Sequence, residues 1–184
     1  GHGFRKTADE RPFPYLDLRR DPSSNNYMKE SLASEDIFTR IRKKGARFTL
    51  MLTDCCNTDP NVNNIVASPV PTQRESADVW NTDNFRKLFL DPARSAIIVT
   101  AADMHQRATS NNNFGGFFSY FFQSSLRKQL GPGVKPDFVT WDVLISDARK
   151  QTIAKAERTY CDKPYIKVNI CRQYPLYRKK FGND

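Results

Sequence analysis

Two short runs of consecutive apolar residues constrain the fold of this chain most strongly. The segments "ARFTLMLT" (46–53) and "SAIIVTAA" (95–102) carry apolar residues at successive positions rather than at alternate ones. A strand with this pattern is covered on both faces, which is typical of parallel sheets flanked by helices. Helical segments alternate with these strands along the chain. The sequence therefore predicts an α/β fold with a helix-flanked, mostly parallel sheet.

The segment 34–45 has the clearest helix signals. Ser34 is placed to cap the helix, and Gly45 is placed to end it. The apolar residues on its expected buried face are Ile37, Phe38 and Ile41.

Three further helices are expected, over 82–90, 114–131 and 140–160. The second of them has a phenylalanine stripe that is expected to pack against the sheet rather than to bind a ligand. The members of this stripe are Phe117, Phe118, Phe121 and Phe122. Residues 163–170 read as an edge strand and 171–182 as a tail, while 11–18 read as a short extended piece.

The composition limits the classes of function. The chain has 184 residues, enough for one domain, and Lys+Arg exceed Asp+Glu by 29 − 20 = 9. The basic residues are spread along the chain apart from a cluster at 178–180, and there is no zinc-finger spacing or aromatic-plus-basic RNA-binding signature. No apolar run is long enough to cross a bilayer. We therefore expect no membrane partner, and nucleic-acid binding is the less favoured alternative.

The four cysteines are Cys55, Cys56, Cys161 and Cys171. Adjacent cysteines rarely form a disulfide framework, and no CxxC spacing offers a metal site. We therefore expect no metal and no other cofactor. This cysteine usage favours a reducing compartment and predicts a cytoplasmic location, although a Cys161–Cys171 bridge stays open.

Cys56 follows the first predicted strand directly, at the start of a polar stretch over 57–76. Reactive groups of α/β sheets collect at the carboxyl ends of strands. Because side chains alternate along a strand, Cys55 and Cys56 are expected to diverge, with one packed and the other near solvent. The competing interpretation of a lone cysteine is a small buried apolar residue.

A nucleophilic cysteine needs a nearby base, and the chain has two histidines, His2 and His105. Glycines flank His2, and the Gly3 N–H could approach a scissile carbonyl. Together with the N–H of Cys56, it would form an oxyanion hole with two donors.

The order of these motifs resembles the caspase and metacaspase superfamily of cysteine proteases. That family has a Ser-Gly-His-Gly motif after its third strand and Asp-x-Cys after its fourth, with the histidine about 50 residues upstream of the cysteine. His2 has this spacing to Cys56, and His105 does not. The matching residues are Gly1-His2-Gly3, Asp54-Cys55-Cys56, Gln106, Gly116, Phe117, Gln173 and Pro175. Asn57-Thr58 departs from the usual His-Ser after the cysteine.

The resemblance implies a caspase-like (caspase-haemoglobinase) three-layer α/β/α sandwich over 1–184 and a His2–Cys56 dyad that cleaves protein or peptide substrates. The family has two strands and two helices before its histidine motif. We therefore expect this chain to be the C-terminal portion of the domain and the remaining N-terminal part to be its partner.

The resemblance also implies specificity for Arg or Lys before the scissile bond. Asp54 and Asp103 would bind the basic side chain, because paired carboxylates favour guanidinium and reject Asp. The competing roles are a cap or turn acceptor for Asp54 and a solvated loop position for Asp103. Arg107 is the nearby cation that an Asp-specific pocket would use.

Autoprocessing is a further implication, since the corresponding loop is often cut in this family, and Arg74 is the predicted self-cleavage position. Calcium activation is known in some members, but no ligand cluster indicates it here. Two alternatives stay open: a catalytically inactive caspase-like module that binds partners, and a basic nucleic-acid-binding α/β domain.

Overall fold

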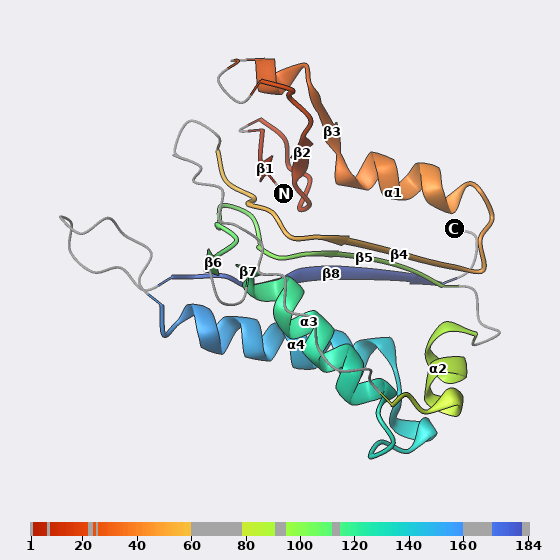
Figure 1. Ribbon diagram of the computed structural model, residues 1–184. Helices are drawn as coiled ribbons and strands as arrows, with labels where there is room; N and C mark the ends of the chain where they lie inside the picture. Colours follow the sequence, from red (N-terminus) through yellow and green to blue (C-terminus); the bar gives the residue numbers. More distant parts are fainter. Residues whose placement is uncertain are drawn as a thin grey trace.

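A computed structural model of the chain describes residues 2–6, 8–21, 24, 26–59, 79–90, 95–111, 115–159 and 171–181. Its centre is a sheet of β4 (Phe48–Thr53), β5 (Ser95–Thr100) and β8 (Leu176–Phe181), in the order β4-β5-β8 (Figure 1). Helices lie on both sides of this sheet, so the predicted α/β class is confirmed. The two expected strands pair in parallel, with Phe48 opposite Ser95 and Thr53 opposite Thr100.

The sheet is mixed rather than mostly parallel, because β8 runs antiparallel to β5. The prediction of a tail over 171–182 was therefore wrong. Its basic residues hide the strand pattern, and they alternate between the two faces of the sheet: Arg178 pairs with Glu35 of α1, and Lys179 bonds Asp142 of α4 at 2.8 Å. The strand expected over 163–170 lies outside the described residues.

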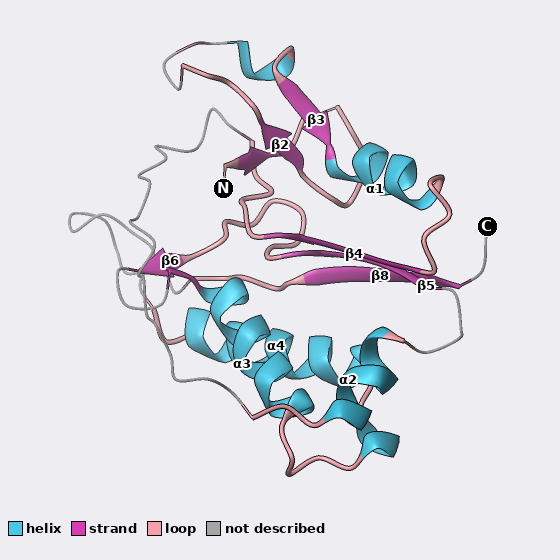
Figure 2. Ribbon diagram, turned by 45° about the vertical axis from the view of Figure 1, so that its right-hand side comes forward, coloured by secondary structure: helices cyan, strands magenta, loops and turns pink. Residues whose placement is uncertain are grey.

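Helix α1 (Ser34–Arg42) covers one face of the sheet. On the other side lie α2 (Thr82–Phe89), α3 (Phe117–Leu130) and α4 (Trp141–Ala156), as Figure 2 shows from a second direction. In the part of the chain that the structure describes, none of these helices is long and apolar enough to span a bilayer.

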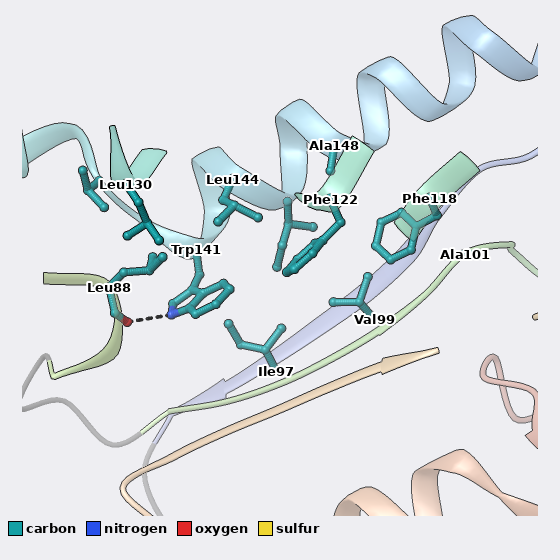
Figure 3. Packing of buried hydrophobic residues seen from close by; sticks show 12 residues of the cluster. Leu88, Ile97, Val99, Ala101, Phe118, Phe122, Leu130, Trp141, Leu144 and Ala148 are labelled. Atoms are coloured by element: carbon teal, nitrogen blue, oxygen red, sulfur yellow. Dashed lines mark hydrogen bonds between the residues drawn. The ribbon is translucent and has the colours of Figure 1, made fainter. Parts of the chain in front are cut away.

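The side chains of β5 explain why both layers are needed. Ile97 and Val99 pack against α3 and α4 in the larger core, where Trp141 donates its indole N–H to the Leu88 carbonyl at 2.8 Å (Figure 3). The intervening Ile98 packs against Phe38 of α1 on the opposite face. Consecutive apolar residues are therefore required at this position.

The predicted phenylalanine stripe of α3 is largely buried, with exposed fractions of 0% for Phe117, 1% for Phe118 and 6% for Phe122. Phe121 is half-buried. Gly131 follows the helix at its expected C-cap.

Two expectations for α1 were wrong. Ala33 rather than Ser34 occupies the N-cap, because the Ser34 hydroxyl donates to the Pro14 carbonyl and Ser34 is buried. Phe38 is buried, whereas Ile41 is 41% exposed, so the apolar stripe is narrower than predicted. Gly45 follows the helix in the left-handed region, with φ +76°, as a helix-ending glycine does.

Strand β4 has a paired edge toward β5 and, among the described residues, no partner strand on its other edge. Leu52 is 40% exposed, so the expected coverage of both faces is incomplete in this part of the chain.

The N-terminal region forms a second small sheet that the sequence did not predict. It contains β1 (Gly3–Phe4), β2 (Tyr15–Asp17) and β3 (Ser31–Ala33), all antiparallel. The expected extended piece over 11–18 supplies its middle strand. The remaining short elements are a hairpin of β6 (Ser110–Asn111) with β7 (Gly115–Gly116), and the 3-10 helices Asn26–Met28 and Pro136–Phe138.

Candidate functional site

Strand β1 runs alongside the segment that follows β4. The Arg5 N–H donates to the Thr58 carbonyl at 2.8 Å. At the other end of the contact, Gly3 lies over Cys55, so closely that a Cβ on Gly3 would be 2.5 Å from the Cys55 sulfur. The structure thus brings the residue after His2 against the residue before Cys56.

The hydrogen-bond pattern of β1 sets the direction of the Gly3 amide. The Asp17 N–H donates to the His2 carbonyl at 3.1 Å, and in the ladder Gly3 lies opposite Leu16. Gly3 and Leu16 are therefore the non-hydrogen-bonded pair, and the Gly3 N–H points away from β2. The Gly3 N–H and the Arg5 N–H point to the same side of β1, and the segment from Cys55 to Thr58 lies on that side.

The two adjacent thiols diverge as predicted. Cys55 is 3% exposed, and burial raises the pKa of its thiol to about 12. Cys56 is half-buried, and its sulfur lies 3.9 Å from the Ala108 carbonyl. Burial also raises the pKa of Cys56, while the nearby Arg107 guanidinium acts in the opposite direction. Both are free thiols, whereas Cys171 is buried and disulfide-bonded, and Cys161 lies outside the described residues.

His2 is exposed and directly precedes β1. The pKa of Asp17 is lowered chiefly by hydrogen bonds from Arg19 and in addition by the charge of His2. No hydrogen bond joins His2 to Cys56 among the described residues.

His105 also lies near the site, although sequence spacing argued against it. It follows β5 with a φ of +65°, and its N–H donates to the Asn57 carbonyl at 2.8 Å. Its side chain is exposed.

Asp54 lies at the N-terminus of α3 rather than on the surface. One of its carboxylate oxygens accepts the Ser119 N–H at 2.8 Å, and a side chain at Gly116 would collide with the same oxygen. Burial raises the pKa of Asp54, and the bonds from Ser119 oppose this shift. This arrangement has the geometry of a helix N-terminal acceptor.

Asp103 occupies the loop after β5 and is half-buried. Its carboxylate accepts the Met104 N–H at 2.7 Å, and no cation of the described ranges forms an ion pair with it. The predicted self-cleavage position, Arg74, lies outside the described residues.

Asn57 is the site residue whose role the sequence did not reveal. It is 0% exposed, and its side-chain amide donates to the Pro12 carbonyl at 2.8 Å and to the Ala102 carbonyl at 3.4 Å. Its backbone pairs with Gln106. Asn57 thus joins the segment after Cys56 to the loop after β5 and to the chain before β2.

Two glutamines fix the same loop from the other side. Gln173 is 1% exposed, donates to the Ala101 carbonyl at 3.1 Å and accepts the Thr109 N–H at 2.9 Å. Gln106 accepts the Tyr174 N–H at 2.7 Å. The resemblance had marked both glutamines, and the structure gives each a hydrogen-bonding role.

Across the described ranges, no three His, Cys, Asp or Glu side chains gather closely enough to hold a metal ion. No protein-family model matches the chain, and no curated protein matches it significantly.

Proposed function

We propose that this chain carries the catalytic residues of a caspase- or metacaspase-type cysteine endopeptidase, with Cys56 as nucleophile and His2 as base. The observation that carries the proposal is the position of Gly3, whose amide faces the segment Cys55–Thr58. An imidazole and an amide donor on adjacent residues, next to a thiol at a strand end, are the parts that thiol proteolysis needs.

In the proposed reaction, His2 accepts the Cys56 proton and the thiolate attacks the scissile carbonyl. The Gly3 and Cys56 N–H groups hold the resulting oxyanion. The tetrahedral intermediate collapses as the protonated His2 gives its proton to the departing amine. A water molecule, deprotonated by His2, then attacks the thioester, which releases the acid and restores the thiol.

We further propose cleavage after Arg or Lys. Asp103 supports this preference because it has no cation partner among the described residues. Asp54 gives this preference no support, because its buried carboxylate accepts the Ser119 N–H at the start of α3. The Arg107 guanidinium lies close enough to Cys56 to oppose the rise of its pKa. Because a cation at this position would favour an acidic substrate side chain, cleavage after Asp is the alternative specificity that the experiment must distinguish.

The proposed enzyme is a three-layer caspase-like domain, and the remaining N-terminal part would pair with β4. Among the described residues, β4 has no partner strand on its outer edge, and Leu52 is 40% exposed. Both observations support this arrangement, because exposed apolar edge strands are normally covered.

A catalytically inactive, partner-binding module is the second candidate. It is favoured by one observation: burial raises the pKa of Cys56, which stabilises the neutral thiol over the reactive thiolate.

The test uses the polypeptide that contains residues 1–184 and fluorogenic peptides ending in Arg, Lys or Asp. We expect hydrolysis after Arg or Lys, and covalent labelling of Cys56 by an arginine chloromethyl ketone. Cys56→Ala should abolish both, whereas Cys55→Ala should keep labelling at Cys56.

The two histidines provide the matched comparison. His2→Ala should lower kcat by about 100-fold or more, the usual contribution of a general base, and His105→Ala should leave it within a few-fold. The reverse result would move the base to His105. Intact folding without hydrolysis or labelling would favour the inactive module, and salt-dependent duplex binding would favour the nucleic-acid alternative.

A further inference from the structure

The end of the sheet opposite Cys56 carries a group of exposed apolar side chains. Cys56 follows the carboxyl end of β4, whereas this group surrounds α2 near the other end of the strands (Figure 1). We call it the distal surface. Its members and their exposed fractions are Trp80 50%, Phe85 36%, Leu90 48% and Phe138 66%.

An aromatic series connects the distal surface to the core. Trp80 stacks on Phe85 with ring centroids 6.3 Å apart, and Phe85 lies 4.8 Å from Phe89. Phe89 meets Trp141 edge to face at 5.3 Å. The exposed rings of Trp80 and Phe85 are therefore connected through Phe89 to the buried Trp141.

A cavity of about 220 Å³ lies beside this series, between α2, the start of α4 and the end of β8. Phe48, Phe89 and Trp141 supply its aromatic wall. Sites for whole small molecules usually measure about 300–1,000 Å³, so this cavity suits a single large apolar side chain. Apolar anchors seated in such pockets dominate the affinity of many protein interfaces.

Three charged side chains line the cavity. Lys87 and Lys179 line it together with one carboxylate, Asp142, which bonds Lys179. Arg47 adds a third cation at the edge, where its guanidinium donates to the Leu90 carbonyl at 3.1 Å. Among the lining residues two lysines stand against one carboxylate, and this local positive charge favours a partner that presents acidic groups next to the cavity.

We infer that the distal surface binds a segment of another protein in which a large apolar side chain is flanked by Asp or Glu. The apolar side chain enters the cavity against Phe89 and Trp141, and the carboxylates lie against Lys87, Lys179 and Arg47. This binding does not depend on the proposed protease activity, because the cavity and Cys56 lie at opposite ends of the sheet.

The two tryptophans of the chain give a direct readout, because Trp80 lies on the distal surface and Trp141 lines the cavity. The probes are three peptide sets: a central Phe or Leu flanked by Asp and Glu, the same with Lys and Arg flanks, and the acidic set with a central Ala. We expect the first set to shift tryptophan emission and to bind at least about tenfold tighter than the others. Added salt should weaken its binding.

Matched variants locate the effect. Lys87→Glu should weaken the acidic peptides by about tenfold, whereas Lys150→Glu, the same charge change at an exposed position of α4, should leave them unchanged. Phe85→Ser should weaken them as well, and Cys56→Ala should not.

Three results would overturn the inference. They are the absence of peptide binding, equal binding of the acidic and basic sets, and self-association of the chain that Phe85→Ser abolishes. The last result would show that a second copy covers the distal surface. If the chain hydrolysed fluorogenic peptides but did not bind the acidic peptides, only this inference would be wrong. If it bound the acidic peptides but hydrolysed nothing, only the proposed protease function would be wrong.

Discussion

The Arg5 amide donates to the Thr58 carbonyl across 2.8 Å, which aligns β1 with the segment after β4. Because amides two residues apart on one strand point to the same side, this bond also fixes where the Gly3 N–H points. The alignment sets Gly3 against the buried Cys55 and leaves the next residue, Cys56, half-buried. One main-chain bond thus relates two segments that lie more than 50 residues apart.

Gly3→Ala tests this alignment. The new Cβ would be 2.5 Å from the Cys55 sulfur and 3.0 Å from the Tyr15 carbonyl oxygen, so β1 must move. Overpacking of this kind costs about 1–3 kcal/mol, which urea denaturation should detect. The control is Gly133→Ala, where an added Cβ has no atom within 4 Å. Equal stability of the two variants would contradict the described contact.

The two adjacent thiols should differ sharply in alkylation. Iodoacetamide reacts with thiolates, and burial raises the pKa of Cys55 to about 12 while covering it almost completely. In the folded chain we expect carbamidomethylation at Cys56, with a rate that increases as pH rises past the ordinary thiol range, and none at Cys55. Peptide mass spectrometry distinguishes the two residues. In urea both should react, which is the control.

The fold was predictable where local pattern and burial agree. Ile97 and Val99 are apolar because both faces of β5 are covered, and this pattern is legible in the sequence. Strand β8 was not predictable, because Arg178 and Lys179 form ion pairs with residues of two different helices. Such partners are known only once the chain is folded. For the same reason Ser34 was assigned as a cap, whereas its hydroxyl reaches Pro14 in a distant segment.

The sequence predicted which residues form the candidate site better than it predicted the contacts that they make. Strand alternation predicted that Cys55 and Cys56 would diverge, and they do, although β4 ends at Thr53 and the chain bends at Cys55. The contribution of Asn57 was not predictable, since its amide binds carbonyls 45 residues away in both directions. Asn57 stands in the polar stretch after β4, and the sequence alone did not show that it is buried.

The buried carboxyl of Asp54 should produce a pH-dependent stability. Burial raises its pKa above the ordinary value of 3.8, so the folded state holds its proton over a pH range in which the unfolded state has released it. Its contribution to the free energy of unfolding is therefore greatest below 3.8 and is lost as pH rises through the folded pKa.

Asp54→Asn removes this titration and keeps an oxygen that can accept the Ser119 N–H. Urea denaturation from about pH 4 to about pH 7 should show the variant gaining stability relative to the natural chain as pH rises. The control is Asp137→Asn, which removes an exposed carboxylate. A difference between Asp54→Asn and the natural chain that does not change with pH would contradict a raised pKa.

Asn57 and Asn84 form a matched pair for separating stability from activity. Both are 0% exposed, and the Asn84 amide donates to three carbonyls near the end of α3, those of Gln129, Gly131 and Val134. Replacing either by Ala leaves buried carbonyls without a donor, and each should cost about 1–3 kcal/mol.

The two variants should differ in their effect on Cys56. Asn57→Ala frees the segment after Cys56 and should change both its alkylation rate and any peptide hydrolysis under conditions in which the variant remains folded. Asn84→Ala lies at the other end of α3 and should change neither. Equal effects of the two variants on Cys56 would mean that global stability alone controls this thiol.

Gln173 should control the order of the loop that faces Cys56. Its side chain joins Ala101 and Thr109 at the two ends of this loop, and Ala108 between them contacts the Cys56 sulfur. Gln173→Ala removes both bonds, so we expect faster amide hydrogen exchange across 101–109 and a loss of about 1–3 kcal/mol in the free energy of unfolding.

Gln151→Ala is the comparison, because the Gln151 amide bonds Asp147 and Ser125 between α3 and α4, away from this loop. Its effect on exchange should be confined to those helices. If Gln173→Ala accelerated exchange uniformly over the chain, Gln173 would stabilise the fold as a whole rather than the loop. Acceleration limited to 101–109 and the neighbouring 55–58 would instead link the C-terminal segment to the environment of the Cys56 thiol.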